Sequence, residues 1–272
     1  MQDFDGKVVA ITGAGSGIGR ALAIELASRG AHLSLSDIDE TTLAETVALV
    51  EGHGVKVTSQ VLDVADRDAV FAWANATAEE HGVVNVIVNN AGVTVMTDIA
   101  TMRHDDFTWL MGIDFWGVVN GTDAFLPHLK ASGDGHVVNV SSVFGLQAIP
   151  GQAAYNSAKF AVRGFTDALQ IELDMEPCGV SATTVHPGGI KTNIVRNARW
   201  DAEGSHDESV TEFDKMARTS PEAAANKILK AVQRNRRRCL IGPDAYVFDL
   251  VSRLPAAIPQ RLLRLMARRA RQ

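Results

Sequence analysis

The sequence predicts an α/β protein, a Rossmann-like doubly wound parallel sheet in a three-layer α/β/α arrangement. Short apolar runs rich in β-formers alternate with longer helical patterns along most of the chain. A glycine cluster also follows the first apolar run directly and precedes a helix. Strands this short and apolar are typical of a parallel sheet covered by helices on both faces, and repeated β-α alternation implies right-handed crossovers.

Each element is expected from its local pattern. The predicted strands are Lys7–Thr12, His32–Ser36, Lys56–Val61, Val84–Val88, His136–Val140, Ser181–His186 and Cys239–Ile241. The predicted helices are Ile18–Arg29, Asp39–Glu51, Arg67–His81, Asp105–His128 and Ala153–Glu176, with another that starts at Pro221 behind the N-cap Ser220. Ligands of such a sheet bind beyond the carboxyl ends of the strands, so the chemistry is expected there.

Composition favours one domain over residues 1–272, since the chain is 46% hydrophobic and large enough for one core. The net charge of −6 argues against nucleic acid as a partner. The two cysteines, Cys178 and Cys239, form neither a metal-ligand spacing nor a disulfide framework, so we expect no metal site and a cytoplasmic protein. Neither a signal peptide nor an apolar run of about 18 residues is visible.

Two segments depart from the alternation. Residues 193–220 are polar and lack a strong period, which predicts a substrate lid. The tail, residues 244–272, holds a predicted helix from Gln260 to Gln272, with apolar and arginine-rich faces. Leu262, Leu265 and Met266 lie on the first, and Arg261, Arg264, Arg268 and Arg271 on the second. Two interpretations stay open: contact with an anionic membrane surface, or packing on a neighbouring subunit of a homodimer or homotetramer.

The glycine cluster predicts a dinucleotide site. Glycines let the backbone turn sharply and approach a pyrophosphate, and the following helix offers free N–H groups and a positive dipole end. The residues expected to bind the phosphates are Gly13, Ser16, Gly17, Ile18 and Gly19. A tight strand-to-helix turn without a ligand would also use glycines, but the strand–glycine–helix context favours nucleotide binding.

Asp37 follows the second predicted strand, where a carboxylate can accept hydrogen bonds from an adenosine ribose. The same charge would repel a 2′-phosphate, so NAD is expected rather than NADP. Ile38 follows the acid where an arginine would favour NADP. Asp37 could instead serve only as a helix N-cap.

Tyr155 and Lys159 are four residues apart on one predicted helix and therefore share a face. Ser141 and Ser142 end the preceding strand at the ligand edge of the sheet. A surface pair would show the same spacing as Tyr155 and Lys159, but the neighbouring serines favour a catalytic group.

With these motifs, the chain resembles the short-chain dehydrogenase/reductase family over roughly residues 7–192. Five motifs carry the resemblance, in this order: Thr12–Gly19 (TGAGSGIG), Asp63-Val64, Asn89–Gly92 (NNAG), Ser142 with Tyr155 and Lys159, and Pro187–Thr192 (PGGIKT). The resemblance implies hydride transfer between a nicotinamide and a carbonyl or alcohol carbon.

The resemblance also implies roles for individual residues. Tyr155 would be the general acid/base, Ser142 would hydrogen-bond the substrate oxygen, and Lys159 would lower the pKa of the phenol and hold the nicotinamide ribose. The other expected cofactor residues are Asp63 and Val64 beside the adenine, Asn90, Ala91 and Gly92 after the fourth strand, and Pro187, Gly188, Ile190 and Thr192 near the carboxamide.

Asp114 departs from the family pattern, because the family usually has an asparagine at this position, where it helps to hold a kink and a water that feeds protons to the lysine. Aspartate keeps the shape but lacks the amide donors. We include Asp114 among the catalytic residues and expect catalysis to survive the change.

The substrate is expected to be a small molecule, a hydrophobic secondary alcohol or ketone, because apolar residues surround the expected cleft: Val93, Val95, Met96, Phe144, Leu146 and Ile149. Two alternatives remain. One is an NADPH-dependent ketoreductase of the acyl-carrier type, against which Asp37 speaks. The other is a catalytically silent NAD-binding sensor or scaffold, against which the intact serine, tyrosine and lysine speak.

Overall fold

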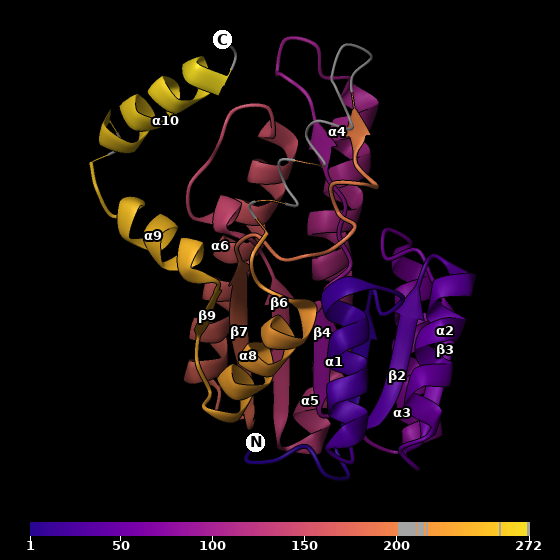
Figure 1. Cartoon of the computed structure of the whole chain (residues 1–272). Coiled ribbons are helices and arrows are strands. Elements are labelled where there is room, and N and C mark those ends of the chain that lie inside the picture. The colour runs from indigo at the N-terminus through magenta and orange to yellow at the C-terminus, as the bar shows by residue number, and fades with distance from the viewer. Residues whose placement is uncertain (201–210, 212–214, 216, 256, 271–272) are drawn as a thin grey trace.

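In the computed structural model a seven-stranded parallel sheet forms the centre of the molecule, in the order β3-β2-β1-β4-β6-β7-β9 (Figure 1). The structure describes residues 1–200, 211, 215, 217–255 and 257–270, and within α10 the side chains of 262 and 265–270 lie outside the description. The strand order reverses between β1 and β4, which is where a doubly wound sheet opens a crevice at its carboxyl edge. The predicted fold class is confirmed.

The strands are β1 (Val8–Thr12), β2 (His32–Asp37), β3 (Val57–Val61), β4 (Val86–Asn89), β6 (Gly135–Val140), β7 (Val180–Pro187) and β9 (Arg238–Ile241). The helices are α1 (Gly17–Ser28), α2 (Glu40–Glu51), α3 (Arg67–His81), α4 (His104–Met111), α5 (Gly117–Ser132), α6 (Ala153–Met175), α8 (Pro221–Gln233), α9 (Pro243–Val251) and α10 (Ala257–Ala270). Every predicted strand is present within a few residues, and so are the predicted helices, except that Asp105–His128 is divided and the end of the tail helix lies outside the described residues. A π-helical segment, η1 (Gly112–Trp116), and a short 3-10 turn, η2 (Val143–Gly145), complete the larger elements.

Helices cover both faces of the sheet. One apolar core lies between the sheet and α1 and α8, and the second between the sheet and α3, α5 and α6 (Figure 1). The strands β1, β4 and β6 are buried throughout, as their continuous apolar runs predict. Two buried layers around one sheet fix the positions of the strand ends that carry the site.

Side-chain caps set several helix starts. Asp39 accepts a hydrogen bond from Thr42 N, Asp66 from Ala69 N and Ser220 from Ala223 N, each satisfying an amide of the first turn. Asp37 is therefore not the N-cap of α2, the role that competed with nucleotide binding in the sequence; Asp39 is.

The predicted single helix Asp105–His128 is wrong in one respect. The structure divides it into α4, η1 and α5, with five π-helical residues around Asp114. A π-turn widens the helix by one residue and is common at functional positions. The irregularity agrees with the kink that the family resemblance implies at this position.

The predicted lid and tail lie only partly within the description. In the lid, β8 (Arg199–Trp200) pairs with β5 (Val95–Met96), whereas residues 201–210, 212–214 and 216 lie outside the described residues. In the tail, α10 covers the predicted helix, but the side chains of Leu262, Leu265, Met266 and Arg268, and Arg271 altogether, lie outside the description. Among the described residues, no helix is long and apolar enough to cross a membrane.

Candidate active site

The turn after β1 is shaped by glycine. Gly13 has φ +64° and Gly17 has φ +52°, conformations that favour glycine. A Cβ on Gly19 would collide with the carbonyl oxygen of Gly13, and one on Gly13 would lie 2.8 Å from Ala91 Cα. The turn therefore has no room for side chains at the positions where the sequence predicts close approach to phosphates.

The first turn of α1 provides the groups that bind anions. Ser16 is the N-cap, its side chain caps no amide, and no acidic residue lies in the first turn. Free amides and the positive end of the helix dipole at a glycine turn suit a pyrophosphate. The residues present here thus fit a dinucleotide.

Asn90 ties the glycine turn to the end of β4. Its Nδ2 donates to Thr12 O at 3.0 Å and to Gly13 O at 3.1 Å, and its backbone N–H donates to Thr12 Oγ1 at 3.0 Å. Ala91 N donates to the same hydroxyl at 3.1 Å. This part of the predicted cofactor set positions the turn through its own contacts.

The carboxylate of Asp37 lies at the end of β2, over the glycine turn. Its Oδ2 accepts a hydrogen bond from Gly15 N at 2.8 Å, and its Oδ1 accepts one from Asp39 N at 3.0 Å. Ile38 beside it is 66% exposed, an unusual state for isoleucine. An adenosine would suit this edge, since a carboxylate can accept hydrogen bonds from its ribose and an apolar side chain can pack against its base.

The nearest cation, Arg20, is already occupied. Its guanidinium donates to Glu45 Oε2 at 2.7 Å, to Thr46 Oγ1 at 3.0 Å and to Thr42 O at 3.1 Å. A 2′-phosphate would therefore meet Asp37 without this arginine free to neutralise it.

Asp63 and Val64 follow β3. The Asp63 side chain accepts a hydrogen bond from Ala65 N at 2.9 Å, and Val64, which is buried, accepts one at its carbonyl from Asn120 Nδ2 at 3.0 Å. A Cβ on Gly117 would collide with Val64. The pair is thus held in place by the start of α5.

A buried ion pair forms the centre of the catalytic end. Lys159 Nζ lies 3.1 Å from Asp114 Oδ2, and their side chains are 3% and 0% exposed. The other carboxylate oxygen of Asp114, Oδ1, accepts a hydrogen bond from Val93 N at 2.7 Å, and Lys159 Nζ donates one to Val140 O at 3.1 Å. Asp114, the departure noted in the sequence, therefore binds Lys159 directly.

Tyr155 lies one turn before Lys159 on α6 and is 9% exposed. The lysine Nζ is 5.5 Å from the centre of its ring. Burial raises the pKa of Tyr155, Lys159 lowers it, Asp114 raises it and hydrogen bonding with Ser142 lowers it, and the net direction is upward.

Lys159 lowers the pKa of the phenol, as the sequence predicts, but burial and Asp114 outweigh it in the protein without cofactor. Asp114 offsets the lysine charge, and both groups are buried with the phenol. Burial lowers the pKa of Lys159, but the combined attraction of Asp114 and Tyr155 raises it by more, so the net direction is upward. In the free protein Tyr155 is therefore a protonated phenol at neutral pH.

Ser142 is set by two contacts at the end of β6. Its hydroxyl accepts Phe144 N at 3.1 Å, and its carbonyl accepts a hydrogen bond from His186 Nδ1 at 2.8 Å. Burial lowers the pKa of His186 to about 4, so the imidazole is neutral and suited to positioning. His186 thus holds the backbone of Ser142 in place.

One residue of the site was missed in the sequence. Asp244, at the start of α9, accepts a hydrogen bond from Gly189 N at 2.7 Å, and a Cβ on Gly188 would collide with its carboxylate. Asp244 lies 55 positions from Gly189, so no local pattern signals it. Ser141, which the sequence places at the strand end beside Ser142, donates from its Oγ to Lys159 O at 2.7 Å and so ties the end of β6 to α6.

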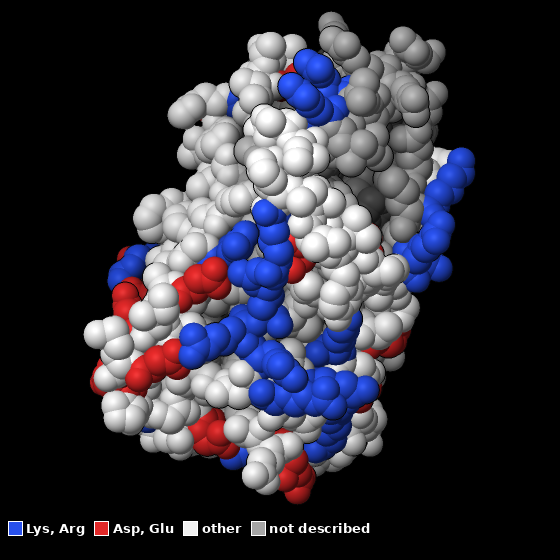
Figure 2. Space-filling model, turned by 90° about the vertical axis from the view of Figure 1, so that its left-hand side faces the viewer, with Lys and Arg blue, Asp and Glu red and all other residues white. Residues whose placement is uncertain are grey.

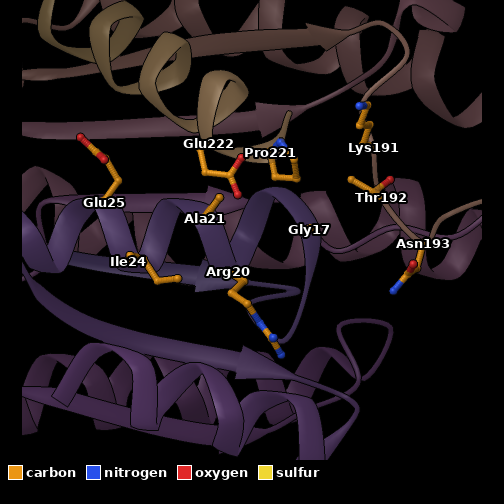
Figure 3. Close-up of a pocket in the computed structure, with 10 residues that line it drawn as sticks. All are labelled: Gly17, Arg20, Ala21, Ile24, Glu25, Lys191, Thr192, Asn193, Pro221 and Glu222. Carbon is orange, nitrogen blue, oxygen red and sulfur yellow. The ribbon is translucent and has the colours of Figure 1, made fainter. Parts of the chain in front are cut away.

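The segment after β7 returns to the glycine turn. A Cβ on Gly17 would lie 3.0 Å from Thr192 Cγ2, and Ile190 is buried where it pairs with Thr219. A cavity of about 250 Å³ opens between this segment, α1 and the start of α8 (Figure 3). Its lining residues are Gly17, Arg20, Ala21, Ile24, Glu25, Lys191, Thr192, Asn193, Pro221 and Glu222. The cavity borders the phosphate end of the site, away from Tyr155.

Comparison with known proteins defines the class. The family model for short chain dehydrogenases matches residues 7–203. The chain therefore belongs to the short-chain dehydrogenase/reductase family and is an oxidoreductase of that family.

One relative and two solved structures place the chain more closely. It is 49% identical over 265 residues to the putative oxidoreductase SadH of Mycobacterium tuberculosis, covering 97% of this chain and 96% of that protein. A short-chain dehydrogenase from Burkholderia phymatum in complex with NAD superposes with a TM-score of 0.85 at 31% identity, covering 92% of this chain and 94% of that one. An alcohol dehydrogenase from Thermococcus sibiricus, complexed with 5-hydroxy-NADP, superposes with a TM-score of 0.71 at 27% identity, covering 84% and 90%.

Proposed function

We propose that the chain is an NAD-dependent dehydrogenase of hydrophobic secondary alcohols, and a reductase of the matching ketones. The observation that carries the proposal is the buried set of Tyr155, Lys159 and Asp114 beside Ser142, at the same sheet edge as the glycine turn. Intact acid/base chemistry next to a nucleotide cradle favours an enzyme over a silent sensor.

Asp37 and Arg20 support NAD over NADP. The Asp37 carboxylate would accept ribose hydroxyls and repel a 2′-phosphate, and Arg20 is engaged by Glu45. The similarity to the NAD complex from Burkholderia phymatum supports the same cofactor. The NADP analogue in the Thermococcus sibiricus protein keeps the NADPH-dependent ketoreductase as the competing function.

When bound, NAD supplies the hydride acceptor and a positive charge beside the phenol. The glycine turn and the α1 amides would hold its pyrophosphate, and Lys159 would hold its nicotinamide ribose. In oxidation, Tyr155 as phenolate takes the proton of the substrate hydroxyl while Ser142 hydrogen-bonds the substrate oxygen. In reduction, Tyr155 as phenol donates that proton.

The charges of Asp114 and Lys159 set how tightly Tyr155 holds its phenolic proton. Because Asp114 offsets the lysine, Tyr155 holds its proton more tightly than it would beside an unpaired ammonium. The protonated phenol suits carbonyl reduction at neutral pH, and alcohol oxidation is expected to rise as the pH rises.

The substrate class is proposed from the walls of the site. Phe144 lies edge-on to Tyr155 at 6.3 Å between ring centroids, and Phe248 of α9 lies 6.0 Å from Phe144. Val95 is buried in the same apolar cluster as Tyr155, and Leu146, two residues after Phe144, is also buried. An apolar alcohol or ketone fits such walls better than a charged one.

The test compares turnover with NAD and NADP on a panel of secondary alcohols of increasing chain length. The proposal expects higher kcat/KM with NAD and an increase with apolar chain length. A clear preference for NADP would favour the ketoreductase instead, and NADH binding without any turnover on the panel would favour the sensor.

A further inference from the structure

Charge is divided sharply along this chain. Residues 227–272 hold 12 of the 26 Lys and Arg residues and two of the 32 Asp and Glu residues, so their formal charge is +10. The preceding 226 residues carry −16. After Asp249 the chain has six arginines and no acidic residue. The basic end is thus opposite in sign to the rest of the protein.

Basic side chains gather on one face of the molecule. Figure 2 views the side on which α9 lies in Figure 1, and Lys and Arg side chains form a band across it. Three acids of α6 and α9 are paired with arginines: Asp249 with Arg238 and Arg253, Asp167 with Arg163 and Arg238, and Asp174 with Arg237. Arg234, Arg236 and the described Arg261 and Arg264 are exposed or partly exposed beyond them.

Apolar side chains are exposed on the helices of the same face. On α9 Tyr246 is 54%, Val247 59% and Leu250 66% exposed, and beyond it Leu254 is 43% and Ile258 52% exposed. The apolar stripe consists of Val247 and Leu250, which share one face of α9, and of Leu254 in the turn after the helix. Exposed apolar groups next to exposed arginines are typical of helices that lie at a lipid–water interface.

The apolar stripe is continuous with the substrate walls. On α9, Phe248 packs against Phe144, which packs against Tyr155. Asp244 of the same helix holds Gly189 in the segment after β7. The face is therefore joined to the site through two contacts of one helix.

We propose that α9, the residues after it and the described part of α10 form a peripheral binding face for an anionic lipid bilayer. The arginines would contact the headgroups and the stripe of Val247, Leu250 and Leu254 would enter the apolar boundary. A second copy of the chain is the competing occupant, since its acidic body could also attract the cations. Exposed apolar side chains on α9, together with the exposed Arg261 and Arg264 of α10, favour the bilayer.

The test is co-sedimentation of the full-length protein with vesicles of phosphatidylcholine alone, or of equal parts phosphatidylcholine and phosphatidylglycerol. The proposal expects binding to the anionic vesicles at least tenfold stronger than to the neutral ones. The protein should be released at about 1 M NaCl, where the Debye length falls to about 3 Å.

Two variants separate the contributions. Val247→Ser with Leu250→Ser and Leu254→Ser removes the stripe, and Arg253→Gln with Arg261→Gln and Arg264→Gln removes charge; each is expected to weaken anionic-vesicle binding at least tenfold. Matched controls are Leu49→Ser, an exposed leucine on α2, and Arg67→Gln on α3, which should bind as the wild type does.

Circular dichroism and sedimentation velocity on every variant show that the fold is kept and report the oligomeric state. Equal binding to neutral and anionic vesicles would overturn the proposal, and so would wild-type binding of anionic vesicles by both triple variants. So would wild-type protein that binds no vesicles while the variants change its oligomeric state, because the face would then be covered by a second copy. The readout is binding, so its outcome is independent of the proposed dehydrogenase activity.

Discussion

The two ends of the proposed active site are built from different materials. The nucleotide end consists of backbone amides and glycines, held by Asn90 and Asp37. The catalytic end consists of buried ionisable side chains, Asp114, Lys159 and Tyr155. The first end should therefore be sensitive to added atoms and the second to changed charge, which makes the two separable by substitution.

The largest effect is expected from Gly19→Ala. Its Cβ would collide with Gly13 O and lie 2.7 Å from Asn90 Nδ2, so the turn must shift. We expect nucleotide affinity to fall about a hundredfold, corresponding to about 2.7 kcal/mol, in a fluorescence titration with NADH. The matched control is Gly164→Ala on α6, where nothing lies within 4 Å and a Cβ should leave binding unchanged. Equal affinity of both variants would break the steric account.

The next effect concerns acid stability. Burial lowers the pKa of His136 and of His186 to about 4, below the usual 6.5. Between about pH 6.5 and pH 4 these histidines are protonated in the unfolded chain but stay neutral in the folded chain. Their contribution to the free energy of unfolding is therefore complete above about pH 6.5 and is lost as the pH drops toward 4. At pH 5 each histidine should cost about 2 kcal/mol, about 30-fold in the unfolding equilibrium.

Thermal melting from pH 7.5 to 5 measures this loss. His186 Nε2 has no hydrogen-bond partner, so its protonation would leave an uncompensated charge. His136→Gln with His186→Gln should melt with a shallower pH dependence than the wild type. An unchanged dependence in the double variant would assign the acid lability to other groups.

Asp37→Ser tests the cofactor preference at the nucleotide end. Removing the carboxylate should reduce the ratio of kcat/KM for NAD to that for NADP by about thirtyfold, since one lost repulsion and one lost hydrogen bond are each worth about 1 kcal/mol. Glu40→Gln, an exposed acid in the next helix, is the control. A ratio that stays constant in Asp37→Ser would remove the main argument for NAD.

Asp114→Asn tests the catalytic end with the smallest expected change in rate. Loss of the negative charge should leave Lys159 freer to lower the pKa of Tyr155. The rising limb of the pH–kcat/KM profile for oxidation should then move to lower pH by about one unit, with oxidation at pH 7 about tenfold faster. An increase in the oxidation rate of more than about a hundredfold would mean that the native site is seriously impaired. A rising limb that stays at the same pH would show that Asp114 does not control the pKa of Tyr155.

The difference between the two ends also decided what the sequence could predict. The sequence could predict the glycine turn, Asp37 and the succession of strands along the chain, because each depends on residues that are neighbours in the sequence. The net effect of Asp114 on Tyr155 depends on burial and on a carboxylate 45 positions from Lys159 along the chain. The sequence signalled Asp114 as a departure, but the direction of the pKa of Tyr155 needed the structure.

The sequence did not predict the π-helical turn or the role of Asp244, for related reasons. Gly112–Trp116 keeps a helical pattern, so a one-residue widening leaves no periodic sign. Asp244, which follows β9, contacts Gly189, which follows the neighbouring strand β7, and the sequence predicted neither a helix nor a site residue at this position. Long-range contacts of this kind are visible only when the sheet has brought the strand ends together.

The most direct test of the account is Tyr155→Phe, measured for NADH binding and for oxidation of a hydrophobic secondary alcohol in the same preparation. The account predicts nucleotide affinity within about twofold of the wild type and a kcat lowered about a thousandfold, as expected for loss of a general acid/base. Oxidation that continues undiminished while NADH still binds would contradict it.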